Sequence, residues 1–115
     1  MESATNLQAL IDTGASVTGI GENILNKLGY PPVGVANLAS PSGVTQTGVY
    51  VVRLVIPSKS DLSFPPNIPR IIIDNIKVVA VKSSNQQLGV LLGRDILSHM
   101  ILVYNGSHAL VTLGY

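Results

Sequence analysis

Ala9-Leu10-Ile11-Asp12-Thr13-Gly14-Ala15-Ser16 is an apolar run that leads into a carboxylate and a glycine-containing segment. The apolar residues predict a buried strand, and the small and hydroxylated residues after Asp12 predict a tight turn. An ionised carboxylate at the end of a buried strand is costly unless hydrogen-bond donors surround it, and the N–H groups and hydroxyls of this turn can supply them. We therefore expect Asp12 to have a chemical role.

A simpler interpretation of the Asp12-Thr13-Gly14 triplet is a surface turn, in which the aspartate caps the turn and the glycine adopts a positive φ. A second segment near the other end of the chain favours the functional interpretation. It reads Val90-Leu91-Leu92-Gly93-Arg94-Asp95-Ile96-Leu97. Neither segment is specific by itself, but their joint occurrence is.

Together, the two segments resemble those of the retropepsins, the single-domain aspartic proteases of retroviruses and of their cellular and bacterial relatives. The resemblance extends over residues 6–113. It implies one domain over residues 1–115, with an all-β, closed barrel-like fold, one or two short helices and a symmetric homodimer as the functional form. The sequence Gly93-Arg94-Asp95-Ile96-Leu97 favours a cellular or bacterial relative.

The resemblance implies that the Asp12 residues of two subunits form the catalytic pair of an aspartic endopeptidase, which binds a peptide or protein substrate. One carboxylate would deprotonate water while the other polarises the scissile carbonyl, and at about 3 Å the two would share one proton. Thr13 would join the two loops across the two-fold axis, and Gly14 would admit the substrate backbone. Ala15 and Ser16 would line the cleft. No cofactor is implied.

Residues 33–56 predict a hairpin, with strand-like runs over 35–39 and 44–56. Retropepsins place their flap between the two motifs, so the resemblance makes this hairpin the lid over the substrate. An extended peptide would then form strand-like hydrogen bonds with it. The candidate substrate-binding residues at its tip are Ser40, Pro41, Ser42 and Gly43.

The resemblance gives Gly93, Arg94 and Asp95 a supporting role, at the start of a short helix that buttresses the active-site loop. Retroviral members often carry an acidic residue two positions after the glycine of Asp-Thr-Gly, where this chain has Ser16. Arg94 therefore needs another partner, and substrate contacts made by that acidic residue would be lost or weakened.

Local patterns predict the remaining elements. Apolar residues at helical spacing predict a helix that ends at Gly29. Two β-branched runs, 70–73 and 76–81, flank Asp74-Asn75, which predicts a two-residue hairpin turn. Asn105-Gly106 predicts a type I′ turn in a C-terminal hairpin, which we expect to build most of the dimer interface. The other bounds are a helix over 21–28, strands over 4–11, 17–20, 88–92, 100–104 and 108–113, a helix over 94–99, and loops over 57–69 and 82–87.

Composition limits the function classes. Seven basic and six acidic residues give a formal net charge of +1, and the basic residues are scattered, so nucleic-acid binding gains no support. The chain has no cysteine, and the two histidines, His99 and His108, have no companions that suggest a metal site. No apolar run reaches the roughly 20 residues of a membrane span, and residues 1–8 lack a secretory signal, so a cytoplasmic location is favoured.

Two alternatives to the protease remain open, and a third, glycosidase-like scheme is set below the supporting role of Asp95. The same fold could serve as a catalytically inactive dimerisation or peptide-binding module. Both motifs could be turns of an unrelated β-barrel binding domain. Asp12 and Asp95 could instead be the two carboxylates of a glycosidase-like site within one chain.

Overall fold

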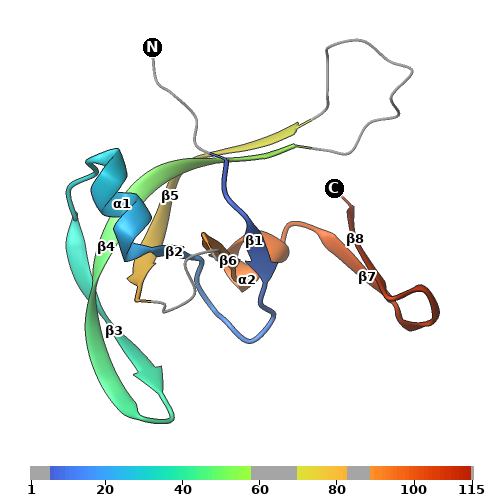
Figure 1. The fold of residues 1–115 in the computed structure, drawn as a ribbon, viewed down its shortest axis with the longest axis horizontal. Helices are drawn as coiled ribbons and strands as arrows, with labels where there is room; N and C mark the ends of the chain where they lie inside the picture. The colour runs from blue at the N-terminus through green and yellow to red at the C-terminus, as the bar shows by residue number, and fades with distance from the viewer. Residues whose placement is uncertain (1–5, 58–69, 83–88, 115) are drawn as a thin grey trace.

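A computed structural model describes residues 6–57, 70–82 and 89–114. Strands dominate these residues: six form one curled sheet and two form a separate hairpin (Figure 1). The fold is therefore all-β, as predicted, and no helix in the described part is long and apolar enough to cross a membrane. The elements are β1 (Ala9–Ile11), β2 (Gly19–Gly21), α1 (Glu22–Leu28), β3 (Gly34–Ser40), β4 (Gly43–Pro57), β5 (Arg70–Val81), β6 (Val90–Leu92), α2 (Arg94–Leu97), β7 (Ile101–Asn105), η1 (Gly106–His108) and β8 (Leu110–Gly114).

The strand order of the large sheet, β1-β6-β2-β5-β4-β3, brings the two sequence motifs together. β1 and β6 are parallel neighbours, with Ile11 opposite Leu92. Because the two strands run in the same direction, Asp12 and Gly93 leave the sheet side by side at the same edge. β2 lies on the other side of β6, antiparallel to it, and is parallel to β5.

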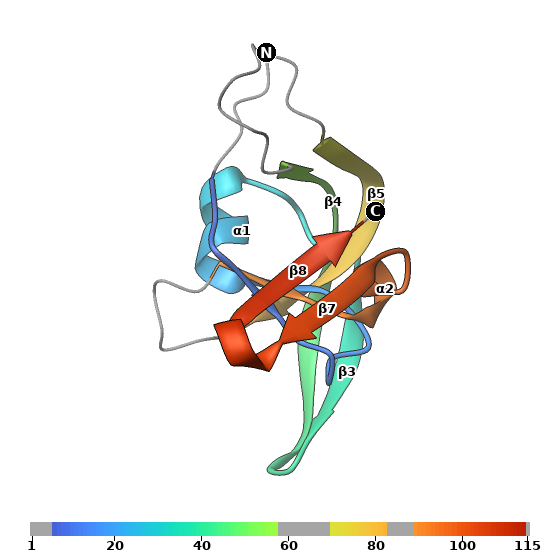
Figure 2. The ribbon, with the colours of Figure 1, turned by 90° about the vertical axis from the view of Figure 1, so that its right-hand side faces the viewer.

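The large sheet curls but does not close within the described residues. β1 and β3 are its two edges, and Figures 1 and 2 show it wrapping only part of the way round the core. β1 is only three residues long, and β7 and β8 pair with each other rather than with it. The closed barrel implied by the family resemblance is therefore corrected to a half-barrel.

Side chains from the sheet and from both helices form one core. Leu25 of α1, Ile96 of α2 and Val78 of β5 are almost completely buried. In β4, Tyr50 and Val52 are buried while the residue between them is more exposed, which is the alternation expected of a strand with one buried face. The helices α1 and α2 thus cover the inner face of the curled sheet.

Most local predictions are confirmed. α1 ends at Gly29, whose φ of 75° is the left-handed conformation that glycine favours after a helix. The hairpin β3–β4 turns at Pro41-Ser42, since Ser40 pairs with Gly43. Three observed elements are shorter than the ranges predicted for them: β1 lies within 4–11, β6 within 88–92 and α2 within 94–99. The strand predicted over 17–20 overlaps β2 only in part. The loops predicted over 57–69 and 82–87 lie outside the described residues, apart from residues 57 and 82.

The hairpin turn predicted at Asp74-Asn75 is wrong. β5 runs without interruption and pairs with β4 on both sides of these residues. Between the pairs Val52–Ile76 and Leu54–Ile73, two residues of β5 oppose one of β4, which defines a β-bulge. A long partner strand decides this outcome, because a ladder on both sides of the bulge forms more backbone hydrogen bonds than a tight turn.

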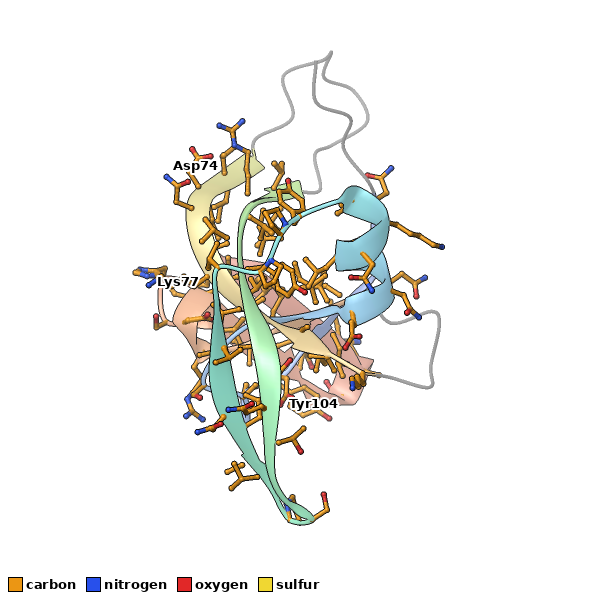
Figure 3. The ribbon with its side chains drawn as sticks, turned by 90° about the vertical axis from the view of Figure 1, so that its left-hand side faces the viewer. Asp74, Lys77 and Tyr104 are labelled. Atoms are coloured by element: carbon orange, nitrogen blue, oxygen red, sulfur yellow. The ribbon has the colours of Figure 1, made fainter. Side chains whose placement is uncertain are left out.

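The bulge accommodates two unlike residues. Asn75 adopts a φ of 56°, a left-handed conformation that asparagine tolerates better than most residues. The carboxylate of Asp74 forms an ion pair with Arg53 on the outer face of the ribbon, where both side chains are more than half exposed. In Figure 3, Asp74 and Lys77 extend from the same side of β5, away from α1. Exposed ion pairs contribute little to the free energy of unfolding. We therefore expect the stability of the bulge to depend more on the backbone conformation of Asn75 than on the Arg53–Asp74 pair.

The C-terminal hairpin is confirmed, but the type I′ turn predicted at Asn105-Gly106 is wrong. Asn105 ends β7 and pairs with Leu110, which begins β8. The loop between them has η1 as a short helical turn, followed by Ala109 with a left-handed φ of 50°.

The register of the strands explains this longer loop. A two-residue turn at 105–106 would place Tyr104 opposite Ser107. The observed loop places Tyr104 opposite Val111 and Leu102 opposite Leu113. Apolar cross-strand pairs stabilise a hairpin, so the side-chain pairing overrides the local turn preference.

We predict that Asn75→Val lowers the free energy of unfolding by about 1–2 kcal/mol, because a β-branched side chain is strained at a positive φ. Asn75→Gly is the matched control, since glycine adopts this conformation freely, and it should change stability by less than about 0.5 kcal/mol. Urea unfolding of both variants measures the difference. Equal stabilities of the valine and glycine variants would contradict a left-handed residue in the bulge.

Candidate active site

Asp12 lies in a tight turn directly after β1 and is half-buried. Its Oδ1 accepts a hydrogen bond from the N–H of Gly14 at 3.0 Å, and its backbone carbonyl accepts one from the N–H of Ala15 at 3.2 Å. A Cβ at Gly14 would lie 3.2 Å from Oδ1, so a larger residue would crowd the carboxylate. The turn therefore fixes the orientation of Asp12, as both the catalytic and the surface-turn interpretations require.

The segment around Gly93 is bonded to this turn. The N–H of Asp12 donates to the carbonyl of Leu92 at 3.0 Å, and the N–H of Arg94 donates to the carbonyl of Ala15 at 2.8 Å. These bonds extend the contact between the two segments of the chain beyond the ends of the paired strands β1 and β6. The structure thus joins the two segments that the sequence singles out.

Arg94 finds its partner in the backbone rather than in an acidic side chain. Its exposed guanidinium donates from Nη1 to the carbonyl of Thr13 at 3.0 Å. The other partner that Arg94 is expected to need, because Ser16 stands where an acidic residue is often found in retroviral members, is therefore the carbonyl of Thr13. The bond holds the peptide unit between Thr13 and Gly14, inside the turn that follows Asp12.

Gly93 crosses the backbone of Val17 at very short range. A Cβ at Gly93 would lie 2.5 Å from both the carbonyl carbon and the carbonyl oxygen of Val17. The next residue, Thr18, is held by hydrogen bonds through its N–H and its carbonyl, so this backbone has little freedom to move away. Glycine is therefore required at this position for steric reasons.

The carboxylate of Asp95 is occupied by structural hydrogen bonds. Its Oδ1 accepts the hydroxyl of Thr18 at 2.7 Å and the N–H of Ile96 at 2.9 Å. Its Oδ2 accepts the N–H of Thr18 at 3.0 Å. These bonds give Asp95 a supporting role and disfavour the glycosidase-like scheme, which needs it free to act on a substrate.

The hairpin β3–β4 extends toward the same end of the molecule as the Asp12 turn. In Figures 1 and 2, the loop after β1 and the tip of the hairpin both lie in the lower part of the view. The hydroxyl of Thr47 donates to the carbonyl of Ala80 at 2.6 Å and anchors the base of the hairpin on β5. Residues 40–43 form the tip, and their contact with a substrate stays a prediction.

Thr18 is the residue of this site that sequence reasoning missed. It is 0% exposed, and its hydroxyl accepts the N–H of Gly93 at 3.1 Å in addition to its bonds with Asp95. In the sequence it stands in Val17-Thr18-Gly19-Ile20, where threonine is an ordinary strand residue. Nothing in that pattern distinguishes it from a threonine on a half-exposed strand.

No family model matches the chain, and a comparison with curated proteins also finds no match. The described residues contain no group of three or more His, Cys, Asp or Glu side chains that could hold a metal ion. The hydrogen bonds and the close crossing described above define the candidate site as the Asp12 turn, residues 16–18 and the segment 92–95.

We predict that Gly93→Ala lowers the free energy of unfolding by about 1–3 kcal/mol, because the added methyl group meets the backbone of Val17. Gly34→Ala is the matched control: a Cβ there has no neighbour within 4 Å, so stability should change by less than about 0.5 kcal/mol. Urea unfolding measures both. Similar losses in the two variants would contradict the close crossing of the two segments.

Proposed function

We propose that two copies of this chain form an aspartic endopeptidase of the retropepsin type, in which the two Asp12 carboxylates activate water for peptide hydrolysis. The observation that carries the proposal is the joining of the Asp12 turn to residues 92–94 by backbone hydrogen bonds. An isolated surface turn needs no such support. A carboxylate that must meet its twin at about 3 Å needs a rigid base, because small displacements are costly in catalysis.

The chemistry requires both subunits. Peptide hydrolysis needs one carboxylate to accept a proton from water and another group to polarise or protonate the scissile carbonyl. A two-fold axis beside Asp12 supplies the same residue twice. Because two carboxylates at about 3 Å do not both ionise easily, the pair would hold one proton and act as acid and base together.

The apolar surface of the hairpin β7–β8 supports a second copy of the chain as the partner. Tyr104 and Ile101 are 73% and 70% exposed. Figure 2 shows the hairpin as a separate ribbon in front of the large sheet. Exposed apolar clusters mark interaction surfaces, and we assign this one to a second copy because one chain supplies only half of the proposed site. Its other exposed apolar residues are Leu102, Val103, Leu110 and Val111.

The substrate would be an extended peptide held between the flap and the Asp12 loop. β3 is an edge strand, and the tip of its hairpin, residues 40–43, would close over the peptide. Ala15 and Ser16, which directly follow the Asp12 turn, would line the floor. Main-chain hydrogen bonds would supply affinity, and the pockets for alternate side chains would set the cleavage preference.

We predict that Asp12→Asn abolishes cleavage of a mixed peptide library at mildly acidic pH, because the amide neither accepts a proton from water nor shares one with its twin. Asp74→Asn is the matched control, since it removes an exposed carboxylate of the bulge, and it should cleave as the wild type does. Cleavage that survives in Asp12→Asn would overturn the proposal. A folded, dimeric wild type that cleaves nothing would favour a peptide-binding module instead.

Mixing the two proteins tests the shared site. If the subunits exchange, adding an equal amount of Asp12→Asn to the wild type should reduce the cleavage rate to about half, because random pairing places half of the wild-type subunits in mixed dimers with one carboxylate. An enzyme with a complete site in each chain would keep its full rate.

We predict that Val103→Lys combined with Tyr104→Lys makes the protein monomeric and lowers cleavage at least about tenfold at equal subunit concentration, since it puts a charge on each face of β7. Both side chains are exposed, so the subunit should still fold. Val55→Lys, an exposed apolar position on β4, is the control and should stay dimeric. Sedimentation velocity measures the assembly. A variant that remains dimeric would contradict the assignment of the hairpin as the interface.

A further inference from the structure

Thr18 has every polar group bonded although it is completely buried. Its N–H and its hydroxyl both donate to Asp95, at 3.0 and 2.7 Å. Its hydroxyl oxygen also accepts the N–H of Gly93 at 3.1 Å, and its carbonyl accepts the N–H of Val79 at 3.1 Å. Thr18 therefore connects three elements: the strand β5, the end of β6 and the start of α2.

The donors around Thr18 fix the direction of each bond. A hydroxyl has one proton to donate, and the N–H of Gly93 already points at its oxygen. The hydroxyl proton is thus directed to Oδ1 of Asp95. Asp95 receives a donor on both oxygens, from the hydroxyl and the N–H of Thr18, and a further one from the N–H of Ile96.

This arrangement requires a carboxylate at position 95. An ionised carboxylate accepts at both oxygens, whereas an amide accepts at one and donates at the other. If asparagine stood there, its NH₂ group would face either the N–H of Thr18 or the N–H of Ile96. Two donors would then oppose each other, and the N–H groups of Thr18 and Ile96 belong to residues that are almost completely buried.

The network is directly linked to the Asp12 turn. Gly93 lies between Leu92, whose carbonyl accepts the N–H of Asp12, and Arg94, which bonds to the carbonyls of both Thr13 and Ala15. Any shift of Gly93 or of the first turn of α2 would move these partners. The position of the Asp12 carboxylate therefore depends on a hydroxyl that does not touch it.

We infer that Thr18 and Asp95 are positioning residues for Asp12: the directed hydrogen bonds from Thr18 to Asp95, with Gly93 as the third member, set the geometry of the catalytic turn. The inference rests on the proposed function for its catalytic consequence. The two residues act through the backbone of residues 92–94 and make no contact with the substrate.

The test uses full-length Thr18→Val, Thr18→Ser and Asp95→Asn. We expect Thr18→Val and Asp95→Asn to lower kcat by roughly 100-fold with little change in KM, as expected when a catalytic group is displaced. Thr18→Ser restores the hydroxyl and should return kcat to within a few-fold of the wild type. A double variant that combines Thr18→Val with Asp95→Asn should lose no more kcat than either single variant, because each substitution removes the same hydrogen bonds.

A second readout does not depend on cleavage. Amide hydrogen exchange of Asp12 and Arg94, whose N–H groups join the two segments, should accelerate at least about tenfold in Thr18→Val and stay near wild-type rates in Thr18→Ser. Val52→Ala, a core truncation away from the site, is the control for lost stability and should retain kcat and slow exchange at these amides.

The outcomes separate the two claims. Wild-type kcat in Thr18→Val, an equal loss of kcat in Val52→Ala, or unchanged exchange at Asp12 and Arg94 would overturn the positioning role. A wild type that cleaves no peptide would overturn the proposed function. The exchange rates would still decide in that case whether Thr18 orders the Asp12 turn.

Discussion

The buried hydrogen bonds of Thr18 are the constraint on which the site depends. They tie the loop after β1 to Gly93 and to Asp95. Because Thr18 is fully buried, its own polar groups cannot bond to water instead, so breaking these bonds is costly unless the local packing opens as well. The loop and the first turn of α2 therefore behave as one unit, and Asp12 belongs to it.

The sheet explains how this unit forms from distant parts of the chain. Thr18 and Asp95 are 77 positions apart, yet β1 and β6 are parallel neighbours, so the chain leaves both strands at one edge. Closing a loop of that length is entropically unfavourable, and the contacts at the edge must offset it. The close crossing of Gly93 over Val17 places the polar groups of both segments within hydrogen-bond distance.

The Asp12 turn and the hairpin β7–β8 differ in whether their own chain satisfies them. The Asp12 turn is held by backbone donors and acceptors from its own chain. The hairpin β7–β8 leaves apolar side chains on both faces without cover among the described residues. In the proposed dimer these features are complementary: the second copy covers the hairpin, and the rigid turn keeps each Asp12 where its twin can share a proton.

The sequence by itself determined the elements whose conformation depends on neighbouring residues. The tight turn at Asp12, the end of α1 at Gly29 and the hairpin tip at Pro41-Ser42 all follow from local residue preferences. Tertiary structure alone decided the outcomes at Asp74-Asn75 and Thr18. A ladder with β4 turned a plausible hairpin signal into a bulge, and burial between distant segments gave an ordinary threonine its partners. At Asp74-Asn75, the residue preference for a tight turn is overridden because pairing with β4 forms more backbone hydrogen bonds than the turn would.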